Sequence, residues 1–384
     1  MKITCITLII ILTCISCQRR RETNIKFKKL VIDFDTYKDR SLDLVNSIDS
    51  IRIVPLETDS TFIIGGIKNL HYNNPYLFIE DPLSRCLFVY DINGNGISKI
   101  ANNGRGAGEF ISITDFTILD DNTIVIIDNM GGKVIFYNLH GDFLREIKIE
   151  DPGMDITCIS AIDNDHLTLF TDYRDTISRV SILDITNGKI KRIPFNLPPY
   201  AQNSQLSLNR TFSKYKDFVL FKTIFDYDVF QITPDSIIPH YQFDFKKYNI
   251  PLTSFDGEIE TYIAYARRND YISNLDDLLE NDKYIYCNFF KGGNAYDLYY
   301  NKQQQQPYIF NTTTLPDEFK SLYSVPKYAK DNYFIFTLAD EDCLHTLLKF
   351  HRASMNYIKL IHNPLTSLEN LENNNPYLLF IYTQ

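Results

Sequence analysis

The sequence contains no tryptophan and only 15 glycines and 15 prolines among 384 residues. Such a low glycine and proline content argues against long disordered stretches. After residue 16, no run approaches the roughly 18 uninterrupted apolar residues that a membrane-spanning helix needs. Positive charge is also scarce, because 39 Lys and Arg face 48 Asp and Glu, for a net charge of −9. An acidic chain repels phosphate backbones, so we expect no nucleic-acid partner.

Motifs for catalysis and cofactor binding are scarce as well. None of the seven histidines forms an HxxxH pair, and no GxSxG motif occurs. The glycines over residues 104–108 lack the following Lys-Ser/Thr of a P-loop. A dinucleotide fingerprint also fails, since the context is strand, loop, strand. We therefore predict no cofactor and no metal site, and the sequence leans against an enzyme without deciding the question.

The amino terminus has the pattern of an export signal. Lys2 precedes an almost wholly apolar run over residues 3–15, which is too short to span a bilayer comfortably. The run ends in Cys14-Ile15-Ser16-Cys17, which resembles a lipobox. The resemblance implies cleavage before Cys17 and lipidation of that cysteine; the alternative is an ordinary secretory signal cleaved nearby. Several acyl chains anchor stably, since each buried CH₂ contributes roughly 0.8 kcal/mol.

An internal repeat dominates the rest of the chain. Residues 76–100 and 123–147 align without gaps at an offset of 47, which places Asp81 on Asp128 and Gly94 on Gly141. A period of 40–50 residues made of short strands is typical of propeller blades. Further copies begin near residues 167 and 218, and β-rich stretches near 283–311 and 322–338 bring the count to about six. The abundance of Tyr and Phe also favours strands.

We therefore predict an all-β fold, a six-bladed β-propeller of four-stranded antiparallel blades with short helical insertions. Residues 51–57 and 377–383 are apolar strands outside the repeats, and we expect them to pair and close the ring. Apolar spacing predicts helices over 258–268 and 341–353, packed against a propeller face; the alternative is that they form a ligand lid. The predicted organisation is a signal peptide (1–16), a lipidated tether and extension (17–48) and the propeller (49–384).

Antiparallel pairing predicts which loops share a face. With the strands of a blade labelled A to D, the B–C turns lie on the same face as the D–A connections between blades. The turns at 81–85 and 128–132 and the loop at 102–110 therefore meet, near Glu80. Our candidate ligand-binding residues are Arg105, Glu109, Asp81, Arg85 and Asp128. The structural alternative is that the aspartates cap their own turns, the glycines supply unusual backbone angles, and Arg105 pairs with a neighbouring carboxylate.

Two other residue sets have alternative interpretations. Four cysteines remain after Cys17, namely Cys86, Cys158, Cys287 and Cys343. Export permits disulfides, but each cysteine lies in a separate predicted blade, which favours buried free thiols. The fifth blade holds a cluster of tyrosines that indicates strand packing or, alternatively, a glycan surface: Tyr296, Tyr299, Tyr300 and Tyr308.

Four segments carry a family resemblance: residues 54–58 (VPLET), 104–110 (GRGAGEF), 228–245 and 375–379 (NPYLL). With them the chain is similar to the six-bladed β-propeller lipoproteins of Bacteroidota, related to NHL-repeat propellers. The resemblance implies an outer-membrane lipoprotein. The segment 18–22 is basic, unlike the acidic tag of surface-exposed relatives, so periplasmic or surface exposure stays open.

The resemblance specifies almost no chemistry, because one fold hosts many activities. The leading hypothesis is a noncatalytic binding or scaffolding module for an unknown protein or glycan ligand, held to the membrane by its lipid. The alternative is an NHL-like lyase or a glycan-processing enzyme that uses the mouth of the central channel. A third hypothesis is an assembly partner of an outer-membrane transport system.

Overall fold

The computed structural model describes residues 26–40, 44, 46–149, 154–171, 179–195, 208–224, 226–251, 259–311, 325–338, 344–345, 359–361 and 375–384. The predicted signal peptide, the lipidation site Cys17 and most of the predicted helix at 341–353 lie outside these ranges. Within them, no helix is both long and apolar enough to cross a membrane.

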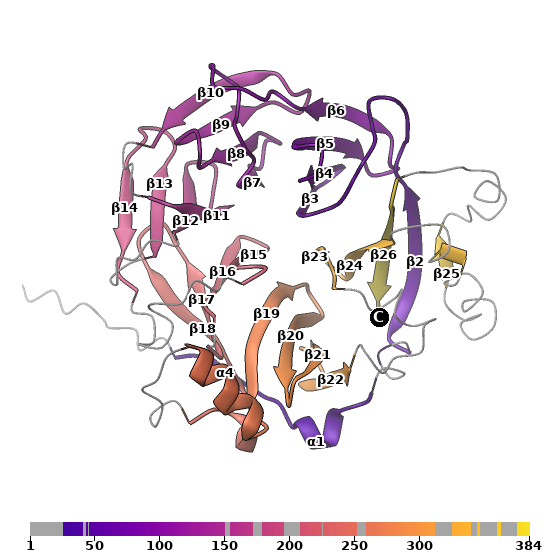
Figure 1. Cartoon of the computed structure of the whole chain (residues 1–384). Coiled ribbons are helices and arrows are strands. Elements are labelled where there is room, and N and C mark those ends of the chain that lie inside the picture. The colour runs from indigo at the N-terminus through magenta and orange to yellow at the C-terminus, as the bar shows by residue number, and fades with distance from the viewer. Residues whose placement is uncertain are drawn as a thin grey trace, which may run out of the picture.

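Six sheets surround a central axis like the blades of a propeller (Figure 1). The first three blades follow one another along the chain. Blade one is built from β3 (Leu70–Asn73), β4 (Tyr76–Asp81), β5 (Cys86–Asp91) and β6 (Gly96–Ile100). Blade two contains β7 (Asp115–Ile118), β8 (Ile124–Asp128), β9 (Lys133–Tyr137) and β10 (Phe143–Lys148). Blade three contains β11 (Ile156–Ala161), β12 (His166–Thr171), β13 (Val180–Asp184) and β14 (Ile190–Ile193).

Blades four and six also contain strands from the amino-terminal part of the chain, whereas blade five is continuous. Blade four contains β15 (Phe212–Tyr215), β16 (Phe218–Lys222), β17 (Asp228–Ile232), β18 (Ile237–Asp244) and, outermost, β1 (Lys28–Val31). Blade five contains β19 (Ile272–Glu280), β20 (Tyr284–Lys291), β21 (Asn294–Asn301) and β22 (Gln306–Asn311). Blade six contains β23 (Tyr328–Lys330), β24 (Tyr333–Leu338), β26 (Tyr377–Thr383), β2 (Ile48–Pro55) and β25 (Lys359–Ile361). The predicted six-bladed architecture is confirmed.

The middle strands of each blade are apolar because neighbouring blades cover both of their faces. Every residue of β8 and β9 is buried. Phe78 and Val89 of blade one pack in one core with Ile124 and Ile126 of blade two. Burying a side chain of this size contributes about 1.5–3 kcal/mol. A blade cannot bury these residues alone, so the blades stabilise one another.

Two strands from opposite ends of the chain close the ring. β2 pairs antiparallel with β26, with Ile51 opposite Ile381 and Val54 opposite Leu378. This confirms the predicted pairing of residues 51–57 with 377–383. β2 thus serves as strand D of blade six, and the chain then crosses to β3 of blade one. The ring joins blade six to blade one without leaving an unpaired sheet edge at that point.

The segment before β2 runs along the outer edges of two blades. β1 pairs in parallel with β18, the outermost repeat strand of blade four. The chain then forms the short helix α1 (Phe34–Tyr37) and makes an isolated bridge between Lys38 and Ile309 of blade five. These contacts cover two strand edges that would otherwise be free to pair with another chain.

The helix α4 (Ile259–Arg268) confirms the insertion predicted over 258–268. It follows the 3₁₀ helix η1 (Lys246–Tyr248) in the connection from blade four to blade five. Its buried residues Tyr262 and Ala266 pack against Leu208, Ile224 and Ile250. α4 lies at the periphery of these two blades, away from the central axis (Figure 1).

Candidate functional site

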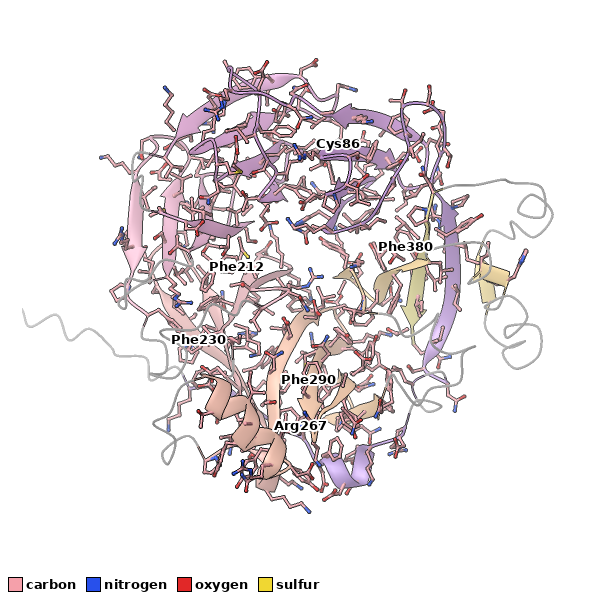
Figure 2. All side chains as sticks on the ribbon, viewed as in Figure 1. Cys86, Phe212, Phe230, Arg267, Phe290 and Phe380 are labelled. Atoms are coloured by element: carbon pink, nitrogen blue, oxygen red, sulfur yellow. The ribbon has the colours of Figure 1, made fainter. Side chains whose placement is uncertain are left out.

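The innermost strands of the six blades, β3, β7, β11, β15, β19 and β23, surround a central channel (Figure 1). Residues on or beside these strands line a cavity of about 790 Å³, including Phe212, which is labelled in Figure 2. This volume is in the range of small-molecule sites, which are commonly about 300–1,000 Å³. All six strands run in the same direction along the axis, so their first residues meet at one end. We call this end the D–A mouth, because the D–A connections lead into it.

Side chains join neighbouring inner strands across the channel wall. The Asn69 amide donates to Asp115 Oδ1 at 3.0 Å, and the Ile159 N–H donates to Asp115 Oδ2 at 2.8 Å. One step further along, the Ala161 N–H donates to the hydroxyl of Thr117 at 3.1 Å. Asp115 therefore connects blades one, two and three at the D–A mouth.

Burial raises the pKa of Asp115 to about 7; the Ile159 N–H opposes the shift, and the nearby Glu80 charge adds to it. Lys68 partly offsets these effects, since it lies at the same mouth and forms a 2.8 Å ion pair with Glu80. A carboxyl group with this pKa carries a proton about half of the time at neutral pH. Such a group can give or take a proton near neutral pH.

Two other titratable groups in the channel are held in their neutral forms. Burial raises the pKa of the Cys158 thiol to about 11, so its reactive thiolate is rare at neutral pH. Burial and the nearby Arg210 and Lys214 charges lower the pKa of His71 to about 3. The His71 ring packs edge-on against Phe116 with the ring centroids 4.7 Å apart. At neutral pH the Cys158 thiol is therefore a poor nucleophile, and the neutral His71 imidazole has no proton to give as an imidazolium acid.

On the opposite side of the mouth, blades four to six contribute charged groups. Arg210 Nη2 donates to the backbone carbonyl of Lys327 at 3.2 Å, and its Nε lies 3.9 Å from Asp277 Oδ1. Asp277 also accepts a hydrogen bond from Asn288 at 3.0 Å. Burial and the Arg210 charge lower the pKa of Lys327.

The predicted residues Asp81 and Asp128 lie on the D–A face, in B–C turns. Asp81 accepts the backbone N–H groups of Gly65 and Leu83 and the hydroxyl of Ser84. Asp128 accepts the N–H groups of Ile111, Ser112 and Gly131. Both carboxylates are fully buried. Each aspartate therefore fixes its own turn and clamps the connection that enters its blade.

The predicted residue Glu109 folds back onto its own loop, where it accepts the Gly106 N–H at 2.8 Å. A Cβ on Gly104 would lie 2.0 Å from that carboxylate, so a side chain there would displace Glu109 from the loop. Among the three loop glycines, only Gly108 has a positive φ, of 68°. The loop is also tied to blade two by Lys133, whose ammonium donates to the Gly106 carbonyl at 2.7 Å.

Arg105 and Arg85 are exposed on the same face. Across the described residues, the Arg105 guanidinium makes no ion pair with Glu109 or Asp128. None of the five predicted ligand-binding residues lines the channel cavity. Glu80, the neighbour named with them, is buried at the channel wall beside Lys68. A ligand role for the five residues stays a prediction.

The remaining sequence expectations concern cysteines, tyrosines and metals. Cys86, Cys158 and Cys287 are free thiols, and Cys343 lies outside the described residues. Tyr299, Tyr300 and Tyr308 are buried in the cores around blade five, which confirms the packing interpretation. Within the described ranges, no group of three His, Cys, Asp or Glu side chains is placed to hold a metal ion.

Sequence reasoning missed the channel residues Asp115, His71, Arg210 and Lys327. The repeat alignment detected strands B, C and D of the first two blades but began after strand A. A usable signal was available, because each strand A ends a few residues before the strand B that the repeat identifies. Including about ten more residues on the amino-terminal side of each repeat would have identified strand A, and with it the residues of the channel wall.

Comparison with known proteins agrees with this architecture. Residues 29–382 match the family described as "Domain of unknown function (DUF4934)". The chain belongs to this family. No curated protein sequence matches this DUF4934 protein.

Solved structures resemble the DUF4934 chain in fold. One is a Bacteroides fragilis protein described as exported, with a TM-score of 0.70 and 20% identity, covering 93% of this chain and all of the other. Another is a DUF4221 protein from Bacteroides vulgatus, with a TM-score of 0.53 and 11% identity, covering 88% and 97%. Virginiamycin B lyase from Staphylococcus aureus has a TM-score of only 0.40 at 12% identity, covering 75% and 81%. This similarity is too weak to support an inference. At these identities the likeness shows the fold alone.

Proposed function

We propose that this protein is an exported, lipid-anchored binding module that receives its ligand at the D–A mouth of the central channel. The cavity is the observation that carries the proposal. It is large enough for a small molecule or the end of a larger ligand, and all six blades contribute to its wall. The exported description of the Bacteroides fragilis protein and the lipobox-like end of residues 14–17 support placement at the cell envelope.

The attachment point of the tether favours this orientation. β18 is strand D of blade four and therefore ends at the D–A face. β1 runs parallel to the second half of β18, so the chain enters β1 at Lys28 from the direction of the opposite face. The residues between Cys17 and Lys28 reach at most roughly 35–40 Å. A lipid on Cys17 would thus hold the opposite face toward the membrane and leave the D–A mouth directed away from it.

Lipid anchoring is tested in cells. Wild-type protein should sediment with membranes and incorporate an alkyne-tagged palmitate, whereas Cys17→Ala should do neither. Equal labelling of the two proteins would show that Cys17 is not the anchor.

Binding is tested with the form that begins after Arg21, screened against glycan and peptide libraries. A bound compound is then titrated into two variants that each add one indole ring. Thr157→Trp places the ring in the channel, and Thr186→Trp places it on an exposed turn outside the channel. We expect Thr157→Trp to abolish binding and Thr186→Trp to retain it, with thermal melts confirming that both variants fold. Binding that survives Thr157→Trp would place the ligand elsewhere, and Arg105→Ala would then test the outer part of the D–A face.

A catalytic alternative rests on Asp115. Its pKa of about 7 suits a general acid or base, and perturbed carboxyl groups cluster at functional sites. A glycan-processing activity would require Asp115→Asn to remove turnover while ligand binding persists. Metal analysis of the purified protein tests the lyase form of this alternative. Turnover of any bound glycan by the wild type would replace the noncatalytic proposal.

A further inference from the structure

Two cations converge at the D–A mouth from blades that are not adjacent in the ring. Arg210 lies two residues before the innermost strand of blade four, and Lys327 immediately precedes that of blade six. Both side chains line the cavity, and the Arg210 side chain reaches across blade five to the Lys327 carbonyl. We propose that Arg210 and Lys327 bind an oxyanion group, a carboxylate or a phosphate, on a small polar ligand. This inference rests on the proposed function and names the chemistry of its ligand.

Arg210 has donor capacity that its surroundings do not use. Its Nη2 bonds to a carbonyl, but its Nε is buried and has no hydrogen-bond partner in the described part of the chain. The nearest carboxylate oxygen, on Asp277, is 3.9 Å from Nε, which is too long for a hydrogen bond. The Arg210 side chain keeps 21% of its surface exposed, so a ligand oxygen can accept from the guanidinium, and hydrogen bonds of this charge-assisted kind are strong.

Lys327 is the second cation with free capacity. Within the described residues, its ammonium forms no ion pair, whereas Lys68 at the same mouth is paired with Glu80. Its pKa is lowered by burial and by Arg210, and the Asp277 charge opposes this shift only in part. An anion between the two groups would relieve both their mutual repulsion and the cost of their burial.

The neighbouring carboxylates do not fully neutralise this pair. Asp277 is the one carboxylate that interacts with both cations in the described structure. Its neighbour Asp276 accepts the backbone N–H groups of Asn209, Arg210 and Asp277 instead. Burial and the Asp277 charge raise the pKa of Asp276. The two cations therefore share Asp277 as their carboxylate neighbour in the described part of this mouth.

The opposite wall offers neutral hydrogen-bonding groups. Blades two and three line the cavity with Thr117, Thr157 and Ser160, and blade four adds Thr211 and Ser213 close to Arg210. A ligand with its charged group at Arg210 and Lys327 would direct its body toward this wall. Hydroxyl groups on a sugar acid or a sugar phosphate match such a surface, since each can donate and accept.

The test uses three probes, inorganic phosphate, glucuronate and glucose, titrated into the form that begins after Arg21. Saturable stabilisation against heat reports binding, because a ligand specific to the folded state raises the melting temperature. Lys327→Gln removes one cation of the pair. Lys148→Gln is its matched control, because it makes the same change of net charge on the exposed outer strand β10.

We expect phosphate and glucuronate to bind saturably and glucose not to bind. Lys327→Gln should weaken both anions about tenfold, the effect of losing one hydrogen bond to a charged group. Lys148→Gln should leave both affinities unchanged. Equal weakening by the two variants would show a nonspecific charge effect and overturn the inference, as would the absence of saturable binding by either anion.

The proposed function fails separately from this inference. Suppose that a neutral ligand binds the wild type, that Thr157→Trp blocks its binding and that Lys327→Gln leaves its affinity unchanged. The channel would then remain the binding site, and the anion chemistry would be rejected. Binding of phosphate or glucuronate that is insensitive to Thr157→Trp and sensitive to Arg105→Ala would reject the channel itself.

Discussion

A buried carboxyl group in blade five predicts that stability falls as pH rises. Asp297 on β21 is 3% exposed. Its Oδ1 accepts the Tyr286 hydroxyl at 2.6 Å, and its Oδ2 has no hydrogen-bond partner among the described atoms. Burial raises the pKa of Asp297 to about 7, although the Tyr286 hydrogen bond opposes the shift, and the Asp277 charge adds to it. In the unfolded chain an aspartate titrates near pH 3.9.

The direction of the pH dependence follows from these two values. Between about pH 4 and pH 7 the folded protein binds the Asp297 proton more tightly than the unfolded chain does. Stability therefore decreases as pH rises through this window and stays reduced above pH 7. A separation of about three pKa units corresponds to about 4 kcal/mol in total, of which roughly 2–3 kcal/mol develops between pH 5 and pH 8.

Asp297→Asn isolates this effect, because the amide keeps the shape and an acceptor for Tyr286 but carries no charge. We expect the stability of the variant relative to wild type to increase by about 2–3 kcal/mol from pH 5 to pH 8. The assay is urea unfolding followed by far-ultraviolet circular dichroism at both pH values. The matched control Asp235→Asn changes an exposed aspartate whose pKa is lowered mainly by Lys191, so its relative stability should be the same at both pH values.

A relative stability of Asp297→Asn that is independent of pH, or that decreases toward pH 8, would refute the reasoning. Either result would mean that Asp297 is ionised in the folded protein at pH 5. The Tyr286 hydroxyl or water would then stabilise the carboxylate better than its burial suggests.

Three further predictions test the fold and the interpretation of the turns. Asp128→Ala should lower the free energy of unfolding by about 3–5 kcal/mol in urea, because three backbone N–H groups lose their acceptor. In the same assay Arg85→Ala, a change at an exposed residue, should alter it by less than about 0.5 kcal/mol. Phe380→Ala should cost about 3–5 kcal/mol in the same assay, since Phe380 is fully buried where β26 joins β2 to β24, and a negligible loss would argue against this closure. Cys86 and Cys287 should react with a thiol reagent only after unfolding, and rapid reaction of either in the native protein would contradict their burial.

The fold was predictable because the strands that define it are buried on both faces. β4, β5, β8 and β9 are apolar along almost their whole lengths, so their repeat at an offset of 47 is visible in one sequence. The closing strands β2 and β26 could also be recognised, because they are apolar strands that remain once the internal repeats have been assigned. Burial between blades leaves a strong hydrophobic pattern in the sequence.

The candidate site was not predictable by the same means. An innermost strand has one edge toward a polar channel, and its sequence is correspondingly mixed, as in β3 with the sequence LHYN. The binding pair Arg210 and Lys327 is separated by more than a hundred residues and shares no motif. β1 was also missed, because its four residues pair in parallel with a strand about two hundred residues later. Contacts of this kind have no local signature in the sequence.

The repeat itself separates structural residues from candidate functional ones. At an offset of 47, Asp81 falls on Asp128, and Gly65 falls on Ser112; in each blade the aspartate accepts the N–H of the second residue. Positions that perform the same structural task in both blades thus keep the same contact. Lys68, by contrast, falls on Asp115, so the same place at the channel mouth carries opposite charge in adjacent blades.

A blade needs no particular charge at that position, because the hydrophobic contacts between blades are made further from the axis. The hydrophobic packing therefore does not explain the departures from the repeat at the channel mouth, although Asp115 and Lys68 also join neighbouring blades there. These departures are explained if the mouth must present different groups on different sides. Blades four and six then supply cations, and blades two and three supply hydroxyl groups and the partly protonated Asp115. A ligand with a charged end and a polar, uncharged body requires that asymmetry, which a six-fold repeated ring does not provide by itself.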